Sequence, residues 1–347
     1  MSHPGTQALA ILLLSDGRPG HFVLSEGIVA ALGRLKKPQV KRLDVKRPAW
    51  MPARVLSWLV NVGLPPTVVL RFIYGISPSA LGNPDIVVSA GGNTLAANIA
   101  AARIAGAPNI FYGSLRRYRA SDFALVMTSY ARDADAPNRM MWLKPTRLDP
   151  DAFAPDDSHE TKLNDEMPLG LIIGGDSGTI SYSGRDWDRL LGFVEAHHTA
   201  TGQTWFVANA PRTPDVVSDR IAALAGPASG AIQRFIDVRT AGPGTLGILL
   251  GNCQAVLCTA DSSTMLSETV WMRRRVIAIE PLSFALPSNE ASYRDWLEES
   301  GWVRRMAIAD LTPDAVTDAL AGLSPLEANP LDALADELRR RFPDLLR

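Results

Sequence analysis

Hydroxyl and acidic side chains gather at residues 259–268, directly after the short apolar run 255–258. The segment includes Asp261, Ser262, Ser263 and Thr264. A strand that ends in small hydroxyl residues and opens a helix directs several N–H groups and the positive end of the helix dipole at one point, which suits a phosphate. Glu268 follows about one to two turns into that helix, where a carboxylate can bind the two hydroxyls of a ribose. The segment therefore predicts a site for a nucleotide diphosphate.

Three glycine-rich turns stand at comparable places, each between a predicted strand and a predicted helix. They contain Gly17 and Gly20, then Gly91, Gly92, Asn93 and Thr94, then Gly174, Gly175, Asp176 and Ser177. In an open parallel sheet, ligands bind at the carboxyl ends of the strands, where all of these turns are expected. Glycine also occurs in tight turns that bind no ligand. The equivalent position of the turns is therefore stronger evidence for a ligand site than any single turn.

Two residues of the first turn, Asp16 and His21, are the candidates for a catalytic base. His21 stands at the start of a predicted helix beside the glycines, whereas His197 and His198 fall within a helical pattern and are expected on a solvated face. Asp16 has an alternative role as a turn residue or helix N-cap, and His21 as a structural hydrogen-bond donor.

None of the four turns matches a better-known catalytic or phosphate-binding motif. They contain neither Gly-x-x-x-x-Gly-Lys-Ser/Thr nor Gly-x-Gly-x-x-Gly, which disfavours nicotinamide and flavin enzymes. The Gly-x-Ser-x-Gly of serine hydrolases does not occur either. Because no turn carries a pair of carboxylates to hold a metal ion, we expect no metal site and no cofactor.

Composition and charge narrow the class of protein. The chain has 347 residues, of which 46% are hydrophobic, enough for two domains with substantial cores. With 35 basic and 36 acidic residues, no global field favours a nucleic-acid partner. Cys253 and Cys258 are expected to be buried thiols in a reducing compartment, with a disulfide or redox pair as the alternative. The apolar run 9–14 is too short for a signal peptide, so a cytoplasmic location is expected.

Short apolar runs alternate with helical patterns, which is typical of parallel sheets covered by helices. Strands are predicted at 8–14, 39–43, 85–89, 109–112 and 123–127 in the first half, and at 169–173, 204–208, 255–258 and 276–279 in the second. Helices are predicted at 22–35, 95–105, 185–199, 214–224, 245–251 and 264–271, and in an apolar tract around 50–76. The fold class is therefore α/β, with two Rossmann-like doubly wound domains that face a cleft.

A change of composition separates the two domains. Residues 145–168 are rich in Pro, Asp, Glu, Asn and Lys and lack apolar periodicity, so they are interpreted as a linker. The boundaries are placed at 1–150 for an acceptor-side domain and at 151–325 for a nucleotide-sugar-binding domain. Residues 326–347 form a charged amphipathic helix, expected to pack back on the N-terminal domain.

The tract 50–76 contains tryptophans, and Arg54 and Arg71 lie in the same stretch. Pro65-Pro66 divides it into halves that are too short to span a bilayer. Such a hairpin fits a patch that lies on a membrane and admits a lipid-linked acceptor, and residues 116–119 add basic charge. The alternative is a pair of ordinary core helices, with a solvated basic turn.

The four turns, taken in order, resemble the mitochondrial-fission Elm-type family, whose fold is that of the two-domain GT-B glycosyltransferases. The motifs are also similar to those of the N-acetylglucosaminyltransferase that forms lipid II. The resemblance spans residues 9 to about 280 and rests on the spacing of the set as a whole.

The resemblance implies roles for these residues. Asp261, Ser262, Ser263 and Thr264 would hold the diphosphate, Glu268 the ribose, and Gly174, Gly175, Asp176 and Ser177 would cover the donor. His21, Gly17 and Gly20 would face the acceptor. Because Asp261 places a negative charge near the diphosphate, the helix dipole or a basic residue, Arg212 or Arg185, is expected to offset it.

The function expected from these residues is transfer of a sugar from a nucleotide-diphosphate sugar to a lipid-linked or envelope acceptor at the inner face of the membrane, without a metal. Two alternatives stay open. One is a nucleotide-sugar epimerase, and the other is a non-catalytic, membrane-associated interaction protein that keeps the same fold.

Overall fold

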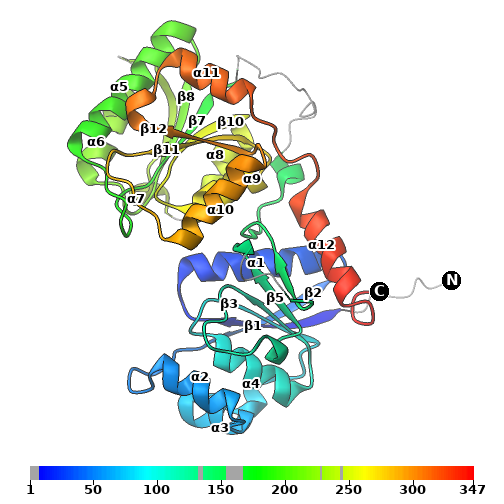
Figure 1. Ribbon diagram of the computed structural model, residues 1–347. Coiled ribbons are helices and arrows are strands. Elements are labelled where there is room, and N and C mark those ends of the chain that lie inside the picture. The colour runs from blue at the N-terminus through cyan, green and yellow to red at the C-terminus, as the bar shows by residue number, and fades with distance from the viewer. Residues whose placement is uncertain (1–7, 132–135, 154–166, 227–228, 243–244) are drawn as a thin grey trace, which may run out of the picture. The chain divides into compact units, whose positions relative to one another are not determined.

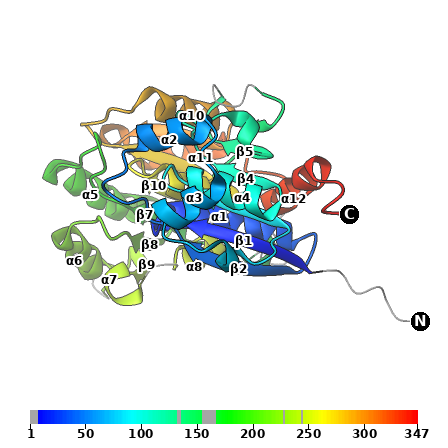
Figure 2. The same cartoon turned by 90° about the horizontal axis from the view of Figure 1, so that it is seen from below.

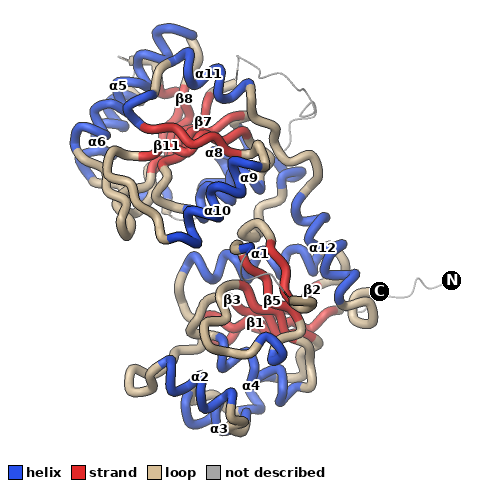
Figure 3. The backbone as a smooth tube through the Cα atoms, in the orientation of Figure 1, coloured by secondary structure: helices blue, strands red, loops and turns tan. Residues whose placement is uncertain are grey.

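The computed structural model describes residues 8–131, 136–153, 167–226, 229–242 and 245–347. Internal contacts divide the chain into two compact units, Met1–Arg147 with Pro330–Arg347, and Leu148–Asn329. Each unit is built on one six-stranded sheet whose neighbouring strands run parallel. Figure 3 shows these strands at the centre of each unit, with helices around them. The predicted α/β class with two doubly wound domains is confirmed.

The first sheet has the strand order β2-β1-β3-β4-β5-β6. Its strands are β1 (Leu9–Ser15), β2 (Pro38–Asp44), β3 (Ile86–Ala90), β4 (Asn109–Tyr112), β5 (Leu125–Thr128) and β6 (Arg139–Met141). Strands β3, β4 and β5 are buried along their whole length, because helices cover both faces of the sheet.

Helices on the two faces of the first sheet come from distant parts of the chain. One face carries α1 (Pro19–Gly33) and the last helix, α12 (Pro330–Arg341). The other carries α2 (Ala53–Asn61), α3 (Pro66–Val68), a π-helix (Val69–Ile73) and α4 (Leu95–Ala105), as Figures 1 and 2 show. Helix α12 contacts α1 through an ion pair of Arg34 with Asp332 at 3.1 Å. The final segment therefore belongs to the first unit.

The second sheet has the order β12-β11-β10-β7-β8-β9. Its strands are β7 (Leu169–Ile173), β8 (Trp205–Asn209), β9 (Ile232–Ile236), β10 (Ala255–Thr259), β11 (Arg275–Glu280) and β12 (Val303–Ala307). One core is formed by α5 (Gly184–Thr201), α6 (Asp215–Leu224) and α11 (Pro313–Ala321). The other side carries α8 (Leu246–Asn252), α9 (Ser263–Trp271) and α10 (Ser288–Glu299), seen in Figure 1.

The order of strands reverses once in each sheet, and this reversal positions the candidate site. In the first sheet it lies between β1 and β3, and in the second between β7 and β10. Connections leave such a pair of strands in opposite directions, which opens a crevice at the carboxyl ends. The four turns singled out above follow these four strands.

Several predicted elements match the structure, and others were missed. The predictions at 109–112, 169–173 and 95–105 have the bounds of β4, β7 and α4. No element was predicted at β6, β9, β12, α10 or α11. In the interval 145–168, Pro150–Phe153 forms a 3₁₀ turn, and residues 154–166 lie outside the described residues.

The apolar tract around 50–76 folds into α2, α3 and the π-helix, with the break at Pro65-Pro66 as predicted. Its buried side gives Leu56, Val60 and Leu70 to the core of the first unit. Its other side exposes Trp50, Val55, Trp58, Val62 and Phe72. Among the described residues, no helix combines the length and the apolar character needed to cross a bilayer.

Candidate functional site

Asp16 and His21 form one pair at the switch point of the first sheet. Asp16 follows β1, and its side chain is only 2% exposed. Both carboxylate oxygens lie 3.0 Å from Nδ1 of His21, which stands in the first turn of α1. The N-cap of α1 is Arg18, without a side-chain hydrogen bond, so Asp16 is not the helix cap. The two residues considered separately as bases therefore act as a unit.

The pairing decides which ring nitrogen of His21 is available. A carboxylate accepts hydrogen bonds, so Nδ1 carries the proton and donates, and Nε2 of the neutral ring is left as the acceptor. In the described part of the chain, no hydrogen bond reaches Nε2, and the His21 side chain is 30% exposed. The geometry is that of a general base held in one tautomer by a buried carboxylate.

The glycine turn after β3 makes room for this pair. Gly91 has φ +86°, and a Cβ built there would lie 2.1 Å from Nδ1 of His21. Asn93 reaches back across the switch point, because its Nδ2 donates to Oδ2 of Asp16 at 3.1 Å. The carbonyl of Asn93 in turn accepts from the hydroxyl of Tyr74 at 3.0 Å. Residues from three segments thus fix Asp16 and His21.

A cation lies next to the second glycine of this turn. A Cβ on Gly92 would lie 2.6 Å from the guanidinium of Arg116, which itself adopts a positive φ of 54°. Of the remaining predicted residues, Thr94 is buried and its hydroxyl contacts the carbonyl of Gly91 at 2.9 Å. Gly20 lies in helix α1, and a Cβ there would contact nothing within 4 Å. The packing of the His21 ring therefore requires a glycine at position 91. A side chain at position 92 would displace only the flexible end of Arg116, and one at position 20 would meet no neighbour.

Asp261 has a structural role in the second unit. Its side chain is fully buried, and Oδ2 accepts from Nη2 of Arg212 at 2.5 Å. Oδ1 accepts from the hydroxyl of Thr259 at 2.7 Å. The expected offset of this negative charge is thus provided by Arg212, while Arg185 has no such contact among the described residues. These contacts of Asp261 hold the turn in shape, and its expected role in holding the diphosphate stays a prediction.

Two glycines after β7 let this ion pair form. A Cβ on Gly174 would lie 2.2 Å from the oxygens of Asp261, and one on Gly175 would lie 2.0 Å from the carbonyl oxygen of Arg212. The N–H of Gly174 donates to the hydroxyl of Thr259 at 2.7 Å. The turns after β7 and β10 therefore pack against each other, as adjacent strands require.

Helix α9 begins at the switch point of the second sheet. Ser262 is its N-cap, and the Ser262 hydroxyl accepts from the N–H of Met265 at 3.3 Å. Thr264 lies in the first turn and is partly exposed, and Glu268 follows in the second turn, also partly exposed. The N-terminus of a helix capped in this way attracts anions through its dipole and its first N–H groups.

A buried tyrosine supports the turn that precedes α9. The N–H of Ala260 donates to the hydroxyl of Tyr182 at 2.9 Å, and this hydroxyl donates to the carbonyl of Ile279 at 3.0 Å. Burial, with a further contribution from the Asp261 carboxylate, raises the pKa of Tyr182 above its ordinary value. The hydroxyl stays protonated at neutral pH and keeps both contacts.

A cavity of about 340 Å³ opens beside the start of α9. It is lined by the turn 177–180, by Asp261 and Ser263, and by Leu286, Pro287, Glu290 and Arg294. Ser177, Asp261 and Ser263 were predicted from the sequence. The residues of α10 were missed, because no element had been predicted there. A Glu and an Arg four residues apart would have indicated a helix in this segment.

The structure also gives the contacts of Asp176, and it contradicts the prediction for His197. The carboxylate of Asp176 accepts from the N–H of Tyr182 at 2.9 Å and from the hydroxyl of Ser181 at 3.2 Å, so it shapes its own turn. His197 is 2% exposed and packs edge-on against Trp205, so it does not lie on a solvated face. Both cysteines are free, buried thiols, as predicted.

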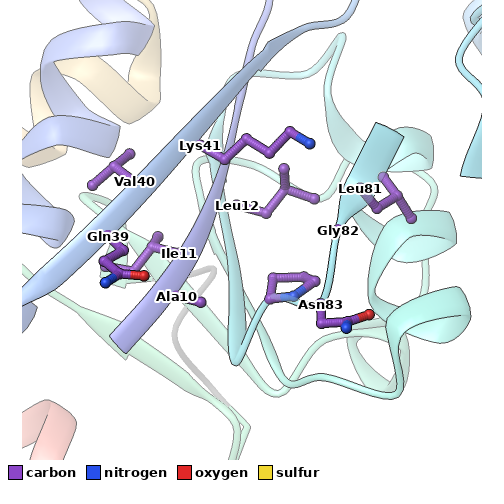
Figure 4. A pocket seen from close by; sticks show the side chains of 10 residues that line it. Ala10, Ile11, Leu12, Gln39, Val40, Lys41, Leu81, Gly82 and Asn83 are labelled. Carbon is purple, nitrogen blue, oxygen red and sulfur yellow. The ribbon is translucent and has the colours of Figure 1, made fainter. Parts of the chain in front are cut away.

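A further cavity, of about 330 Å³, lies in the first unit, beside the first half of β1. Figure 4 shows it between β1, β2 and the segment 81–84. Among the described residues that line it, Lys41 is the one with a charge. It offers no base or acid beside that lysine, so we do not place the candidate site there.

Comparisons with known proteins agree with this architecture. The sequence profile of the family described as "Mitochondrial fission ELM1" matches residues 19–342, whereas no curated protein matches the sequence. MurG of Acinetobacter baumannii shares 14% identity, with 96% of this chain and 99% of that one covered and a TM-score of 0.51. UDP-GlcNAc 2-epimerase of Methanocaldococcus jannaschii shares 12%, with 97% and 100% covered and a TM-score of 0.54.

A glycotransferase of kitacinnamycin is similar as well, with 14% identity, complete coverage of both chains and a TM-score of 0.50. At such identities the likeness establishes the fold alone, and that fold is shared by transferases and an epimerase. The profile match over residues 19–342 identifies the family, which the fold alone does not. This chain, with its two Rossmann-like units of the GT-B type, belongs to the mitochondrial fission ELM1 family.

Proposed function

We propose that this protein is a glycosyltransferase that moves a sugar from a nucleotide-diphosphate sugar to a hydroxyl of an acceptor. The observation that carries the proposal is the buried Asp16 that holds Nδ1 of His21 at 3.0 Å and leaves Nε2 available. Base catalysis needs an imidazole whose free nitrogen can take a proton, held in place by a second group, at a position where ligands bind. Asp16 and His21 provide this pair at the switch point of a doubly wound sheet. We assign the acceptor to the first unit and the donor to the second.

In the proposed reaction, Nε2 of His21 takes the proton of the acceptor hydroxyl. The oxygen then bonds to the anomeric carbon of the sugar, and the bond from that carbon to the phosphate oxygen breaks. The leaving nucleoside diphosphate keeps the bonding electron pair and gains negative charge. The positive end of α9, capped by Ser262, would stabilise this charge without a metal.

Nucleotide binding tests the donor assignment. UDP, GDP, CDP and ADP are to be screened for a rise in the melting temperature of the full chain, since a ligand at 100 times its Kd adds about 2.7 kcal/mol of stability. Glu268→Ala is expected to lower the affinity for the nucleotide that binds by about 10- to 100-fold. The reason is the loss of a hydrogen bond to a charged group.

The matched control is Glu195→Ala, which removes an exposed glutamate from α5 of the same unit. Its nucleotide affinity should equal that of the native chain. If no nucleoside diphosphate raises the melting temperature, the donor assignment is wrong. That result would favour the alternative of a non-catalytic interaction protein. Formation of an isomerised sugar without any acceptor would identify an epimerase.

We further propose that the acceptor is lipid-linked or an envelope saccharide, reached at the inner face of the membrane. The aromatic side chains of Trp50, Trp58 and Phe72, all in the tract 50–76 of the first unit, are 66%, 62% and 69% exposed. Between Asp44 and Asp85 the sequence has no acidic residue, while Arg54 and Arg71 lie in this stretch. Exposed aromatics among cations support binding to an anionic bilayer.

Replacing both Trp58 and Phe72 with serine should weaken sedimentation with vesicles of phosphatidylglycerol by more than about tenfold, since each aromatic contributes about 1.5–3 kcal/mol when buried. The control is Val216→Ser, which removes a residue 66% exposed on α6 of the other unit. Equal binding of the two variants, or binding indifferent to lipid charge, would contradict the membrane assignment.

A further inference from the structure

The cavity beside α9 contains a guanidinium with an unused donor. Arg294, on α10, has a side chain only 3% exposed. Its Nη2 donates to the carbonyl of Ala260 at 2.6 Å, and its Nη1 lies 3.1 Å from Oε2 of Glu290. Its Nε is buried and has no hydrogen-bond partner among the described residues. A buried donor without a partner is costly, so a ligand oxygen in the cavity would stabilise it.

Glu290 provides the complementary acceptor. It lies one turn before Arg294 on α10, lines the same cavity, and its side chain is 24% exposed. Oε2 faces Arg294, and a carboxylate has lone pairs for further donors. A sugar hydroxyl both donates and accepts. One hydroxyl oxygen can therefore accept from Nε of Arg294, while a neighbouring hydroxyl donates to Glu290.

The charge of the lining selects against an anionic ligand. The described lining residues include two carboxylates, Asp261 and Glu290, and one guanidinium, Arg294. That guanidinium already faces Glu290, so no cation of the lining is left to balance an added negative charge. The cavity volume of about 340 Å³ is at the low end for small-molecule pockets, which run from about 300 to 1,000 Å³.

We infer that this cavity is the subsite for the sugar of the donor, and that Glu290 and Arg294 make it selective for a neutral sugar over a uronic acid. The inference rests on the proposed function, because the start of α9 beside the cavity is where the diphosphate would bind. Ser177 and Thr179 also line the cavity. The Thr179 hydroxyl donates to the carbonyl of Ala285, so it can only accept from a sugar hydroxyl.

The experiment compares affinities for matched donors by calorimetry on the full chain. The probes are UDP, UDP-glucose and UDP-glucuronate, with GDP, GDP-mannose and GDP-mannuronate as the second set. The neutral sugar is expected to bind about tenfold more tightly than its uronate, because a carboxylate would lie near Glu290. In Glu290→Gln this ratio should fall at least severalfold, while the affinity for the unsubstituted diphosphate stays the same.

Two further variants separate recognition from folding. Glu195→Gln makes the same chemical change on the exposed surface of α5 and should leave the ratio unchanged. Arg294→Lys keeps the charge but removes Nε, and it should weaken binding of the neutral sugar more than that of the diphosphate. If no nucleoside diphosphate binds the native chain, including CDP and ADP, the proposed function fails. If a diphosphate binds while the uronate matches the neutral sugar, or Glu290→Gln leaves the ratio intact, this inference alone is wrong.

Discussion

Replacing His21 with alanine is expected to lower the kcat of sugar transfer by about 10²- to 10⁴-fold, the usual contribution of a general base. The side chain removed is the only one at this switch point with a ring nitrogen directed by a buried carboxylate, at 3.0 Å from Asp16, among the described residues. The measurement is the release of nucleoside diphosphate from the donor in the presence of an acceptor. Donor affinity should not change, because the donor is assigned to the other unit.

Two companion measurements separate chemistry from structure. Added imidazole should restore part of the activity of His21→Ala, since it can occupy the space and take the proton. Asp16→Asn keeps the size of the side chain, but an amide no longer holds His21 in one tautomer, so kcat should fall while the melting temperature changes little. Native activity in His21→Ala would refute the role given to the pair.

Replacing Gly91 with alanine is expected to lower kcat by about 100-fold or more, although residue 91 does not contact the reacting atoms. A Cβ at this position would lie 2.1 Å from Nδ1 of His21, so the imidazole must move away from Asp16. A displacement of about 1 Å in a catalytic group can cost this much rate. The positive φ of 86° adds about 1–2 kcal/mol of backbone strain.

Gly106 provides the matched control for that strain. It has φ +64° in the same unit, after α4, and a Cβ there would contact nothing within 4 Å. Gly106→Ala should lose a similar free energy of unfolding, measured in urea, but keep the native kcat. If the two variants lose activity equally, the effect comes from backbone strain and the packing of His21 on Gly91 has no catalytic importance.

The strands that sequence analysis missed share one place in the fold. β6, β9 and β12 are edge strands of the two sheets. β9 and β12 keep solvent-exposed positions, and β12 carries Arg304 and Arg305. An inner strand of a parallel sheet is buried on both faces, so its sequence is a continuous apolar run. An edge strand is partly exposed and its sequence contains polar residues. The sequence signal is therefore strong for the inner strand β7 and weak for the edge strands β6, β9 and β12.

The sequence by itself determined the local units and the position of the turns. Apolar runs followed by glycine or hydroxyl residues predicted where the strands end and the helices begin, as at Ser262 and Gly91, because these signals depend on neighbours in the chain. The same pattern identified Asp16 and His21 as candidate bases, because they stand five residues apart on one strand-to-helix turn.

Only the tertiary structure decided which turns meet and which groups pair. Asn93 contacts Asp16 from 77 positions away, Arg212 neutralises Asp261 across 49, and Arg294 contacts Ala260 across 34. Those contacts follow from the order of strands in each sheet, which places β1 beside β3, and β7 and β10 side by side between β8 and β11. Local propensity does not encode that order, because it is set by the burial of whole sheet faces and by the helices that cover them.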